Sequence, residues 1–276
     1  MKLVSFNING LRSRIHQLSE VHTKHQPAIL GLQEIKVADE AFPSGDIEPF
    51  GYSTNYFGQK GHYGVALMAR QAPLSVQLGF PWDDADAQRR MVIADYATTT
   101  GPLRVLNGYF PQGESRDHAT KFPAKRKFYA DLTRYLTEHC DPNAQLVLMG
   151  DVNVSATDLD IGIGEDSRLR WLKTGRCSFL PEEREWLAAL LDWGLVDVYR
   201  QRFPNDDTRF SWFDYRSFGF EKEPKRGLRI DLILATASVA SRVVDAGIDY
   251  EIRAMPKPSD HCPIWVDVDV ELSTSS

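Results

Sequence analysis

Short runs of apolar, β-branched and aromatic residues recur along the chain, separated by polar and turn-forming residues. These runs predict β-strands at 3–8, 28–33, 52–57, 64–70, 75–80, 91–97, 103–109, 145–149, 209–213, 230–235, 243–252 and 263–270. Helical patterns are fewer, and the clearest cover 14–25, 123–140 and 181–193. Because short turns separate some strands and helices separate others, the pattern predicts mixed β-sheets covered by helices, and two packed sheets would suit the length.

The organisation of the chain is that of one globular unit. No linker or internal repeat interrupts the 276 residues, so we expect a single domain over 1–272 and a frayed tail at 273–276. A hydrophobic content of 42% excludes a disordered chain. Uncharged runs are too short to span a membrane, no secretion signal opens the chain, and the three cysteines lack the spacing of a zinc site. We therefore expect a cytoplasmic monomer that does not bind membranes.

The charged residues suggest binding to a polyanion only in three short segments and not from the net charge. The net charge of −6 predicts no long-range attraction to a polyanion. Basic residues nevertheless gather in three runs, which contain Arg116, Lys121, Lys125, Arg126 and Lys127, then Arg168, Arg170, Lys173 and Arg176, then Lys222, Lys225, Arg226 and Arg229. One such run is most often a solvated surface, but three in an acidic protein favour local contacts with phosphate groups.

Polar residues follow the apolar runs where the predicted strands end, or lie at the start of the later ones. They are Asn7 and Asn9, Glu34, Asn107 and Tyr109, Asp151 and Asn153, Asp231, and the pair Asp260 and His261. Each has an ordinary structural interpretation, such as a capping acid, an Asx turn or a structural histidine. Asp231 lies inside an apolar run, however, and burying its carboxylate would be costly without a partner, for which histidine is the natural candidate. If these strand ends share one rim, their side chains form one pocket.

The residue types in that pocket indicate a class of chemistry. Carboxylate and amide oxygens without cysteine suit hard cations such as Mg²⁺ or Mn²⁺ and disfavour zinc. Such a site acts mainly on phosphates, with a carboxylate to take a proton from water and a histidine to neutralise phosphoryl oxygens. The chain contains no GxSxG, GxxxxGK[ST] or GxGxxG motif that would indicate another chemistry.

Nine ordered blocks of sequence carry a resemblance to a known family. They are SFNINGLRSR (5–14), LQEIK (32–36), GQKGHYGVALM (58–68), NGYFPQGESRDH (107–118), MGDVNV (149–154), CSFLPEEREW (177–186), RFSWFDYRS (209–217), RGLRIDLIL (226–234) and KPSDH (257–261). In these blocks and across essentially the whole chain, the sequence closely resembles the bacterial exonuclease III family of the exonuclease–endonuclease–phosphatase superfamily. The resemblance implies a four-layer α/β sandwich of the DNase I type, in which helices flank two packed mixed sheets.

The resemblance also implies roles for individual residues. It places metal binding at Asn7, Glu34, Asp151, Asn153, Asp260 and His261, and catalysis at Tyr109, Asp151, Asn153, Asp231 and His261. Together with the basic runs, it leads us to expect DNA contacts at Arg116, Lys121, Arg168, Arg170, Lys173, Arg176, Trp212 and Arg226. Two positions depart from the family pattern, because Asn9 replaces an aspartate of eukaryotic relatives and Ile35 replaces the usual threonine. We therefore leave Asn9 out of the metal set.

The expected function is a Mg²⁺-dependent DNA repair nuclease, for which Mn²⁺ can substitute. It would degrade duplex DNA from 3′ ends, incise 5′ to abasic sites and remove 3′ phosphates or other 3′ blocks. Two alternatives remain open from the sequence. One is a phosphatase of the same superfamily acting on a small phosphorylated metabolite or lipid, and the other is an inactive DNA-binding module, which the intact carboxylates and His261 disfavour.

Overall fold

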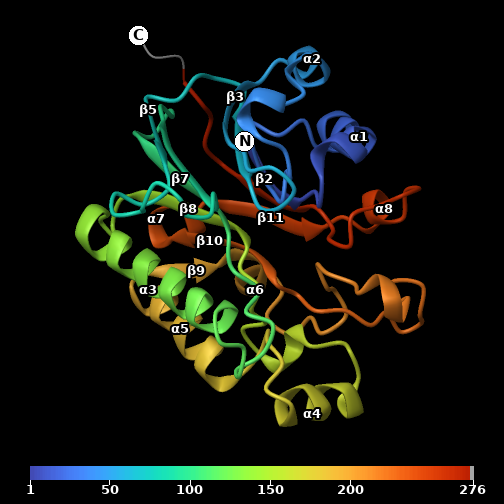
Figure 1. The fold of residues 1–276 in the computed structure, drawn as a ribbon. Helices are drawn as coiled ribbons and strands as arrows, with labels where there is room; N and C mark the ends of the chain where they lie inside the picture. The colour runs from blue at the N-terminus through green and yellow to red at the C-terminus, as the bar shows by residue number, and fades with distance from the viewer. Residues whose placement is uncertain (274–276) are drawn as a thin grey trace.

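Two six-stranded mixed sheets form the centre of the computed structural model, which describes residues 1–273 (Figure 1). The first sheet has the strand order β11 (Val243–Ile248), β12 (Ile264–Val268), β1 (Lys2–Asn7), β2 (Ile29–Gln33), β4 (Val65–Ala69) and β3 (Ser53–Phe57). The second has the order β5 (Ser75–Leu78), β6 (Met91–Tyr96), β7 (Leu103–Tyr109), β8 (Gln145–Asp151), β10 (Asp231–Thr236) and β9 (Leu195–Asp197). The expectation of mixed sheets is confirmed.

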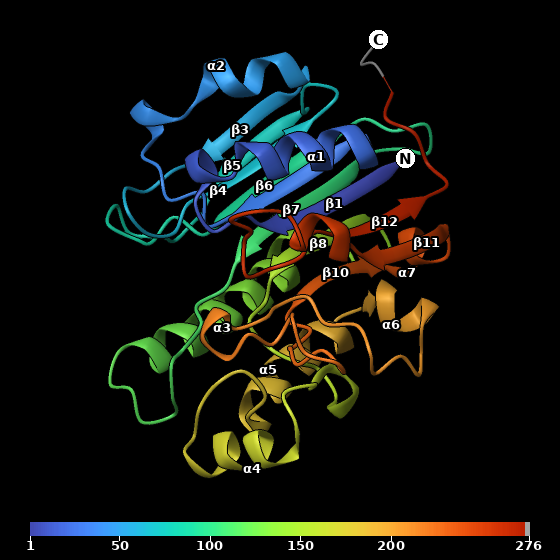
Figure 2. The same ribbon diagram turned by 90° about the vertical axis from the view of Figure 1, so that its right-hand side faces the viewer.

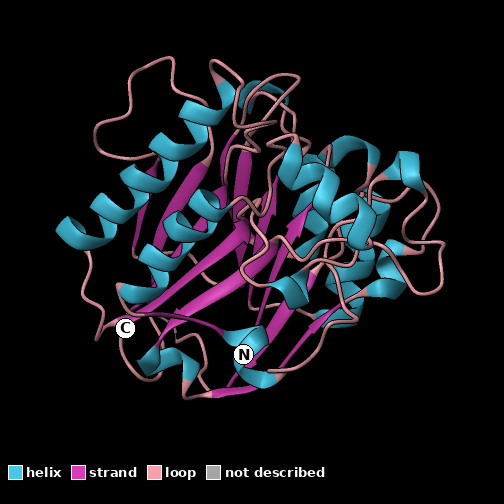
Figure 3. Ribbon diagram, turned by 90° about the horizontal axis from the view of Figure 1, so that it is seen from below, coloured by secondary structure: helices cyan, strands magenta, loops and turns pink. Residues whose placement is uncertain are grey.

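Helices cover the outer face of each sheet, which gives four layers (Figures 2 and 3). The first sheet is covered by α1 (Ile15–His25), α2 (Ser44–Ile47) and α8 (Tyr250–Arg253), and the second by α3 (Lys121–His139) and α5 (Pro181–Asp192). The shorter helices are α4 (Glu165–Lys173), α6 (Val198–Arg202) and α7 (Ala237–Ala240), with single 3₁₀ turns at Leu11–Ser13, Asp39–Ala41, Glu48–Phe50, Asp158–Asp160 and Tyr215–Ser217. The expected four-layer α/β sandwich is confirmed.

The alternation of side chains along the strands builds the layers. In β1, Leu3 packs into the core between the two sheets, whereas Val4 and Phe6 pack into the core under α1. Both faces are apolar because both are covered, so this strand is an almost continuous apolar run and not an alternating one. The sequence therefore predicts this strand clearly, but it does not indicate which side chains face the other sheet and which face the helices.

Strand direction brings the polar strand ends to one rim of the sandwich. β1 is parallel to β2, and β7 is parallel to β8, so the carboxyl ends of each pair lie together. β10 runs antiparallel to β8 and places Asp231 directly opposite Asp151. β12 runs antiparallel to β1, so the segment that leads into β12 with His261 reaches the same rim.

Two expectations about elements are wrong, and some elements were not expected. Residues 209–213 form only isolated bridges from Trp212 to Leu228 and His261, because this segment crosses the rim instead of joining a sheet. The run 243–252 divides into β11 and α8, where Asp249 accepts a hydrogen bond from the Ile252 amide and begins a helix. The sequence also gave no indication of β9 or of α4, since β9 has only three residues and α4 is mostly polar.

The remaining expectations about the whole chain concern its tail, membranes and cysteines. Ser273 donates its amide to the Ala97 carbonyl, and the rest of the expected tail, 274–276, lies outside the described residues. Among the described residues, no helix combines the length and the apolar character needed to cross a membrane. Cys140, Cys177 and Cys262 are all free thiols. The single-domain boundary stays a prediction.

Candidate active site

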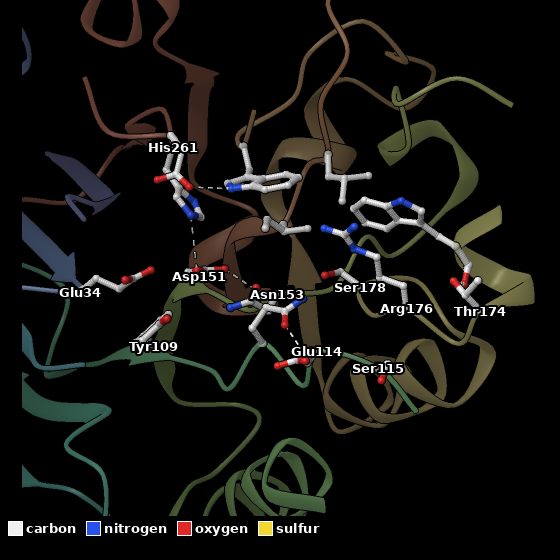
Figure 4. Close-up of a pocket in the computed structure, with 16 residues that line it drawn as sticks. Glu34, Tyr109, Glu114, Ser115, Asp151, Asn153, Thr174, Arg176, Ser178 and His261 are labelled. Carbon is white, nitrogen blue, oxygen red and sulfur yellow. Dashed lines mark hydrogen bonds and ion pairs between the residues drawn. The ribbon is translucent and has the colours of Figure 1, made fainter. Parts of the chain in front are cut away.

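A cavity of about 570 Å³ opens at the rim where the strand ends meet (Figure 4). Eight residues that the sequence singled out line it, namely Glu34, Tyr109, Asp151, Asn153, Arg176, Trp212, Asp260 and His261. In Figure 4, Glu34, Tyr109, Asp151 and His261 gather at one end of the cavity, and Ser115, Thr174 and Arg176 lie toward the other. The cavity therefore has an acidic, titratable end and an opposite end lined by Ser115, Thr174 and Arg176.

Asn7 joins the two sheets at the acidic end. Its wholly buried side-chain amide donates to Glu34 Oε1 and to Asp151 Oδ2, both at 2.9 Å. Glu34 follows directly after β2 and has a φ of 51°, a left-handed conformation that turns its carboxylate back over the strand ends. The ammonium nitrogen Nζ of Lys36 lies 2.8 Å from Glu34 Oε2 and forms an ion pair with it. One amide thus holds two carboxylates from different sheets close together.

A buried histidine lies between two buried aspartates at the same end. His261 Nδ1 lies 2.8 Å from Asp231 Oδ2, and Nε2 lies 3.8 Å from Asp151 Oδ2. All three residues are at most 3% exposed. The Ser211 hydroxyl accepts the backbone amides of Ile230 and Asp231, which fixes the start of β10. The partner that the buried Asp231 requires is therefore His261, as the sequence predicted.

The charges of this cluster perturb one another. Burial raises the pKa of Asp151 to about 8, and the carboxylates of Asp231 and Glu34 add to this effect, whereas His261 opposes it. Burial alone would lower the pKa of His261, but the carboxylates of Asp231 and Asp151 outweigh it and raise this pKa to about 10. Near neutral pH the imidazole is therefore charged, and Asp151 is poised to exchange a proton.

The donor set of this cluster fits a hard divalent cation. Glu34, Asp151 and His261 each offer one ligand atom, and these atoms lie within 4.8 Å of one another. No cysteine lines the cavity, and oxygen atoms dominate this end. Burial is the main cause of the raised pKa of Asp151, and a cation here would offset the repulsion between carboxylates that adds to it. The residues present therefore suit a metal centre at the acidic end.

Asn153 and Tyr109 flank the cluster from the second sheet. Asn153 adopts a left-handed φ of 55°. Its backbone amide donates to Asp151 Oδ1 at 3.0 Å, and its side-chain amide donates to the Phe110 carbonyl at 3.0 Å. Burial and the nearby Glu34 carboxylate hold the pKa of Tyr109 well above its ordinary value, so the phenol keeps its proton. The Arg90 guanidinium lies over the ring of Tyr109 at 4.7 Å from its centroid. Tyr109 is therefore held as a hydrogen-bond donor.

Asp260 is engaged differently from the other acids. Its Oδ1 accepts from the Asn9 side chain at 2.8 Å, and its Oδ2 accepts from the Trp212 indole at 3.0 Å. Asn9 in turn accepts from Lys36 Nζ at 2.5 Å. Asp260 thus lines the cavity and holds Trp212 in place, and its expected role in metal binding stays a prediction. Ile35 is buried, and its backbone amide donates to the Gly64 carbonyl.

The basic residues expected at DNA lie at different places around the cavity. Arg176 lines it and stacks on Trp171 at 3.9 Å from the ring centroid, and α4 carries Arg168, Arg170 and Lys173 on the adjoining surface. Arg116, Lys121 and Arg168 form exposed ion pairs with Glu182, Glu114 and Glu165. Arg226 lies close to Gly164, just before α4. Their contacts with DNA stay predictions.

Sequence reasoning missed part of the cavity and misplaced one residue. The cavity is also lined by Gln112, Glu114, Ser115, Trp171, Thr174, Ser178, Leu228 and Ile230. Six of these lie in the blocks that carry the family resemblance, but the sequence analysis assigned none of them to the site. Asn107 is wholly buried between the sheets, where it accepts from the Gln33 side chain and donates to the carbonyls of Leu32 and Ala66. Its inclusion among the pocket residues was wrong, because it precedes the end of β7 by two residues and so lies below the rim.

Comparison with known proteins places this site in a family. Residues 4–261 match the Endonuclease/Exonuclease/phosphatase family. This chain belongs to that family. The match spans every strand end described above, from Asn7 to His261.

Individual relatives are similar over nearly their whole length. Exodeoxyribonuclease III of Haemophilus influenzae is 58% identical over 267 residues, which cover 97% of this chain and 99% of the relative. An AP endonuclease from Archaeoglobus fulgidus superposes with a TM-score of 0.87 at 33% identity, covering 98% of this chain and 99% of the other. A 3′ phosphatase from Neisseria bound to a product DNA hairpin superposes with a TM-score of 0.86 at 34% identity, with the same coverage. The resemblance to exonuclease III and the expected fold are confirmed.

Proposed function

We propose that this chain is a metal-dependent DNA repair nuclease of the exodeoxyribonuclease III class. It would shorten duplex DNA from 3′ ends, incise 5′ to abasic sites and clear blocked 3′ ends. The observation that carries the proposal is the buried array of Asp231, His261 and Asp151 facing Glu34, in a chain 58% identical to an exodeoxyribonuclease III. The Neisseria relative with its bound DNA hairpin supports duplex DNA as the partner.

Glu34 and Asp151 supply the carboxylates of the candidate metal centre, with Asn7, Asn153 and Asp260 expected to assist, and we assign it Mg²⁺, with Mn²⁺ as a substitute. His261 lies within ligand distance of both carboxylates, but its charged imidazole has no free lone pair, so we assign it to the phosphate and not to the metal. When bound, the cation would supply positive charge to a phosphate and its leaving oxygen. Asn7 keeps the Glu34 and Asp151 carboxylates converged, since it bonds both. The hard oxygen donors match the preference of Mg²⁺.

The remaining side chains account for hydrolysis of a phosphodiester. Asp151 takes the proton from the attacking water as the general base of the site. Its raised pKa favours the protonated form, and a bound cation would favour the ionised carboxylate that accepts the proton. His261, kept charged and oriented by Asp231, donates toward the phosphoryl oxygens as negative charge develops on them. Tyr109 and Asn153 donate to the same oxygens from the side of the second sheet.

Substrate recognition would use an apolar wall of the cavity that Trp212 and Leu228 form. It lies beside the acidic end, because Trp212 donates to Asp260 and bridges to His261, and it suits a deoxyribose that has lost its base. We propose phosphate contacts for Arg116, Lys121, Arg168, Arg170, Lys173, Arg176 and Arg226, which would fix the duplex in register. A phosphatase for a small metabolite or lipid would need neither this wall nor the basic surface beyond it.

A single substrate panel tests the proposal. The parent protein and its Asp151→Asn variant are given a 5′-labelled duplex with one internal abasic site, an undamaged duplex with a recessed 3′ end, and an inositol phosphate. Each is assayed with EDTA, with Mg²⁺ and with Mn²⁺. We expect incision and 3′ degradation only with added metal and only for the parent. Full cleavage in EDTA after verified metal removal would refute the metal centre, and turnover of inositol phosphate alone would establish the phosphatase alternative.

A further inference from the structure

Lys125 of α3 is a lysine without any solvent contact. Its side chain and that of its partner Glu183 are both 0% exposed. The ammonium meets three acceptors, namely the Glu183 carboxylate, the Asn153 carbonyl at 2.8 Å and the Gln112 carbonyl at 3.2 Å. A lysine has three N–H donors, so every one is used inside the protein. Although Lys125 belongs to a basic run in the sequence, it has no donor left for a phosphate.

The two carbonyls belong to the loops that form the floor of the cavity. Gln112 lies in the loop after β7, and Asn153 lies in the loop after β8. Asn153 holds a left-handed backbone that links it to Asp151 on one side and to the Phe110 carbonyl on the other. A donor that fixes the Asn153 carbonyl therefore fixes the peptide plane from which its side chain projects. Lys125 therefore connects the two loops from the interior, in addition to the hydrogen bond between Asn153 and the Phe110 carbonyl.

Glu183 keeps the cation in this position. Its second oxygen accepts the Leu180 amide at 2.8 Å and so caps the start of α5. The segment just before α5 pairs with the β8 loop, because the Ser155 amide donates to the Ser178 carbonyl at 2.8 Å. The carboxylate is thus anchored by a helix start that is itself anchored to the loop. Hydrogen bonds therefore connect the lysine, the helix start and the loop.

We propose that Lys125, held by Glu183, is a positioning residue that fixes Asn153 for the reaction. A buried ion pair is weak evidence for stability, since an apolar pair of similar volume often packs as well. An apolar pair could not, however, satisfy the two loop carbonyls, which need a donor here. The inference rests on the role proposed above for Asn153.

The experiment is a double-mutant cycle on turnover. Lys125→Met with Glu183→Gln removes the ammonium without leaving an unpaired charge, and the glutamine still accepts the Leu180 amide. Four proteins are compared: the parent, the Lys125/Glu183 variant, Asn153→Ala, and the combination of all three substitutions. Incision of the abasic duplex is measured for each under single-turnover and steady-state conditions. We expect the Lys125/Glu183 variant to lose about 10- to 100-fold in kcat with KM within about threefold, because small misplacement of a reacting group costs up to about 10²-fold. In the Asn153→Ala background the same change should cost less than about threefold, since the group it positions is gone.

A control variant separates positioning from general loss of stability. Leu136→Ala removes a buried side chain of the same helix about three turns away from Lys125, where it packs far from the loops. It should lower Tm while leaving kcat within about twofold at a temperature where all variants are folded. If the Lys125→Met and Glu183→Gln variant does not fold, Lys125→Gln is used in the same cycle, because its amide can still donate to Glu183.

The possible results distinguish a failure of the positioning role of Lys125 from a failure of the role proposed for Asn153. Equal losses of kcat with and without the Asn153 side chain would overturn the positioning role, as would a loss that Leu136→Ala reproduces at matched Tm. An Asn153→Ala variant with parental kcat would instead overturn the role proposed for Asn153, and the inference would fall with it. Loss confined to kcat and abolished by Asn153→Ala would establish that Lys125 acts through Asn153.

Discussion

Replacing Asp231 by asparagine should separate catalysis from stability. The carboxylate of Asp231 is the partner of His261 at 2.8 Å, and it is the leading charge that keeps the imidazole protonated. An amide at this position removes the negative charge and can present its NH₂ group to the ring. The imidazole then loses its fixed orientation and the largest of the charges that raise its pKa, so only the weaker effects of Asp151 and Asp260 still favour the charged form.

The size of the effect follows from the bond that is lost. A hydrogen bond to a charged group contributes about 1.5–3 kcal/mol, and each 1.36 kcal/mol is a factor of ten, so the rate should fall about 10- to 150-fold. Stability should not fall. Asp231 faces the buried carboxylate of Asp151 across β8 and β10, and its Oδ1 has no hydrogen-bond partner among residues 1–273. A neutral amide relieves this repulsion.

The chain contains a matched control for this change. Asp249 is a second buried aspartate bonded to a buried histidine, with Oδ2 at 2.7 Å from His25 Nε2, and it lies outside the cavity. Lys24 also pairs with it at 2.8 Å. Asp249→Asn should keep parental incision and lose about 1.5–3 kcal/mol, which for a chain of this size lowers Tm by about 3–12 °C.

The assay is single-turnover incision of the abasic duplex at saturating enzyme, with Tm measured on the same preparations. Asp231→Asn should lose rate at an unchanged or higher Tm, and Asp249→Asn should lose Tm at an unchanged rate. A rate within threefold of the parent for Asp231→Asn would remove Asp231 from the orienting role. Equal rate losses in both variants would show that the effect is one of stability.

Three further predictions concern Asp151, Trp212 and the pH dependence of stability. Asp151→Asn should lose about 10²–10⁴-fold in turnover while binding abasic duplex nearly as well as the parent, because an amide cannot take the water proton; turnover within tenfold would remove Asp151 from that role. Trp212→Ala should lower abasic-site incision about 5- to 150-fold at subsaturating substrate, since one aromatic wall contributes about 1–3 kcal/mol. The indole is only half-buried, so Tm should change little. A large drop in Tm with normal incision would show that Trp212 is structural instead. Burial favours a raised pKa for Asp249, but hydrogen bonds from His25 and Lys24 outweigh it and hold the pKa below the ordinary range. The stabilising effect of the Asp249 carboxylate is thus complete above the unfolded pKa of about 3.9 and is lost as the pH falls below it. The difference in unfolding free energy between the parent and Asp249→Asn should therefore shrink on acidification. A constant difference between pH 7 and pH 3 would contradict this.

Most strands and the main helices could be predicted from the sequence because their signals are local. Apolar and β-branched runs mark strands such as β2, β4 and β8 whatever lies around them, and α3 and α5 have a periodic apolar face that a window of residues reveals. The polar residues that follow those runs, above all Glu34 and Asp151, could be singled out for the same reason. The ordered motifs then identified the family, which the comparisons confirm.

The sequence did not indicate where segments without a strong local pattern would lie. The run 209–213 has the alternation of a strand, yet it crosses the rim, because Trp212 bonds to Asp260 and pairs with Leu228 instead of entering a sheet. β9 is too short to show a period, and it exists because β10 offers it an edge. Asn107 and Asn153 both follow apolar residues of neighbouring strands. Asn107 lies within β7 and is buried between the sheets, whereas Asn153 lies just after the end of β8 and lines the cavity.

The tertiary structure alone decided which charges serve the site and which serve the fold. Lys125 and Lys121 lie four residues apart in one basic run, but Lys125 is sealed against Glu183 and the two loop carbonyls, whereas Lys121 remains at the surface. His25 and His261 each face a buried aspartate, and only His261 reaches the strand ends where Glu34 and Asp151 converge. Composition and spacing are properties of the chain, but burial and the partner of a charge are set by what other segments bring beside it, and in a low-dielectric interior those partners determine what the charge does.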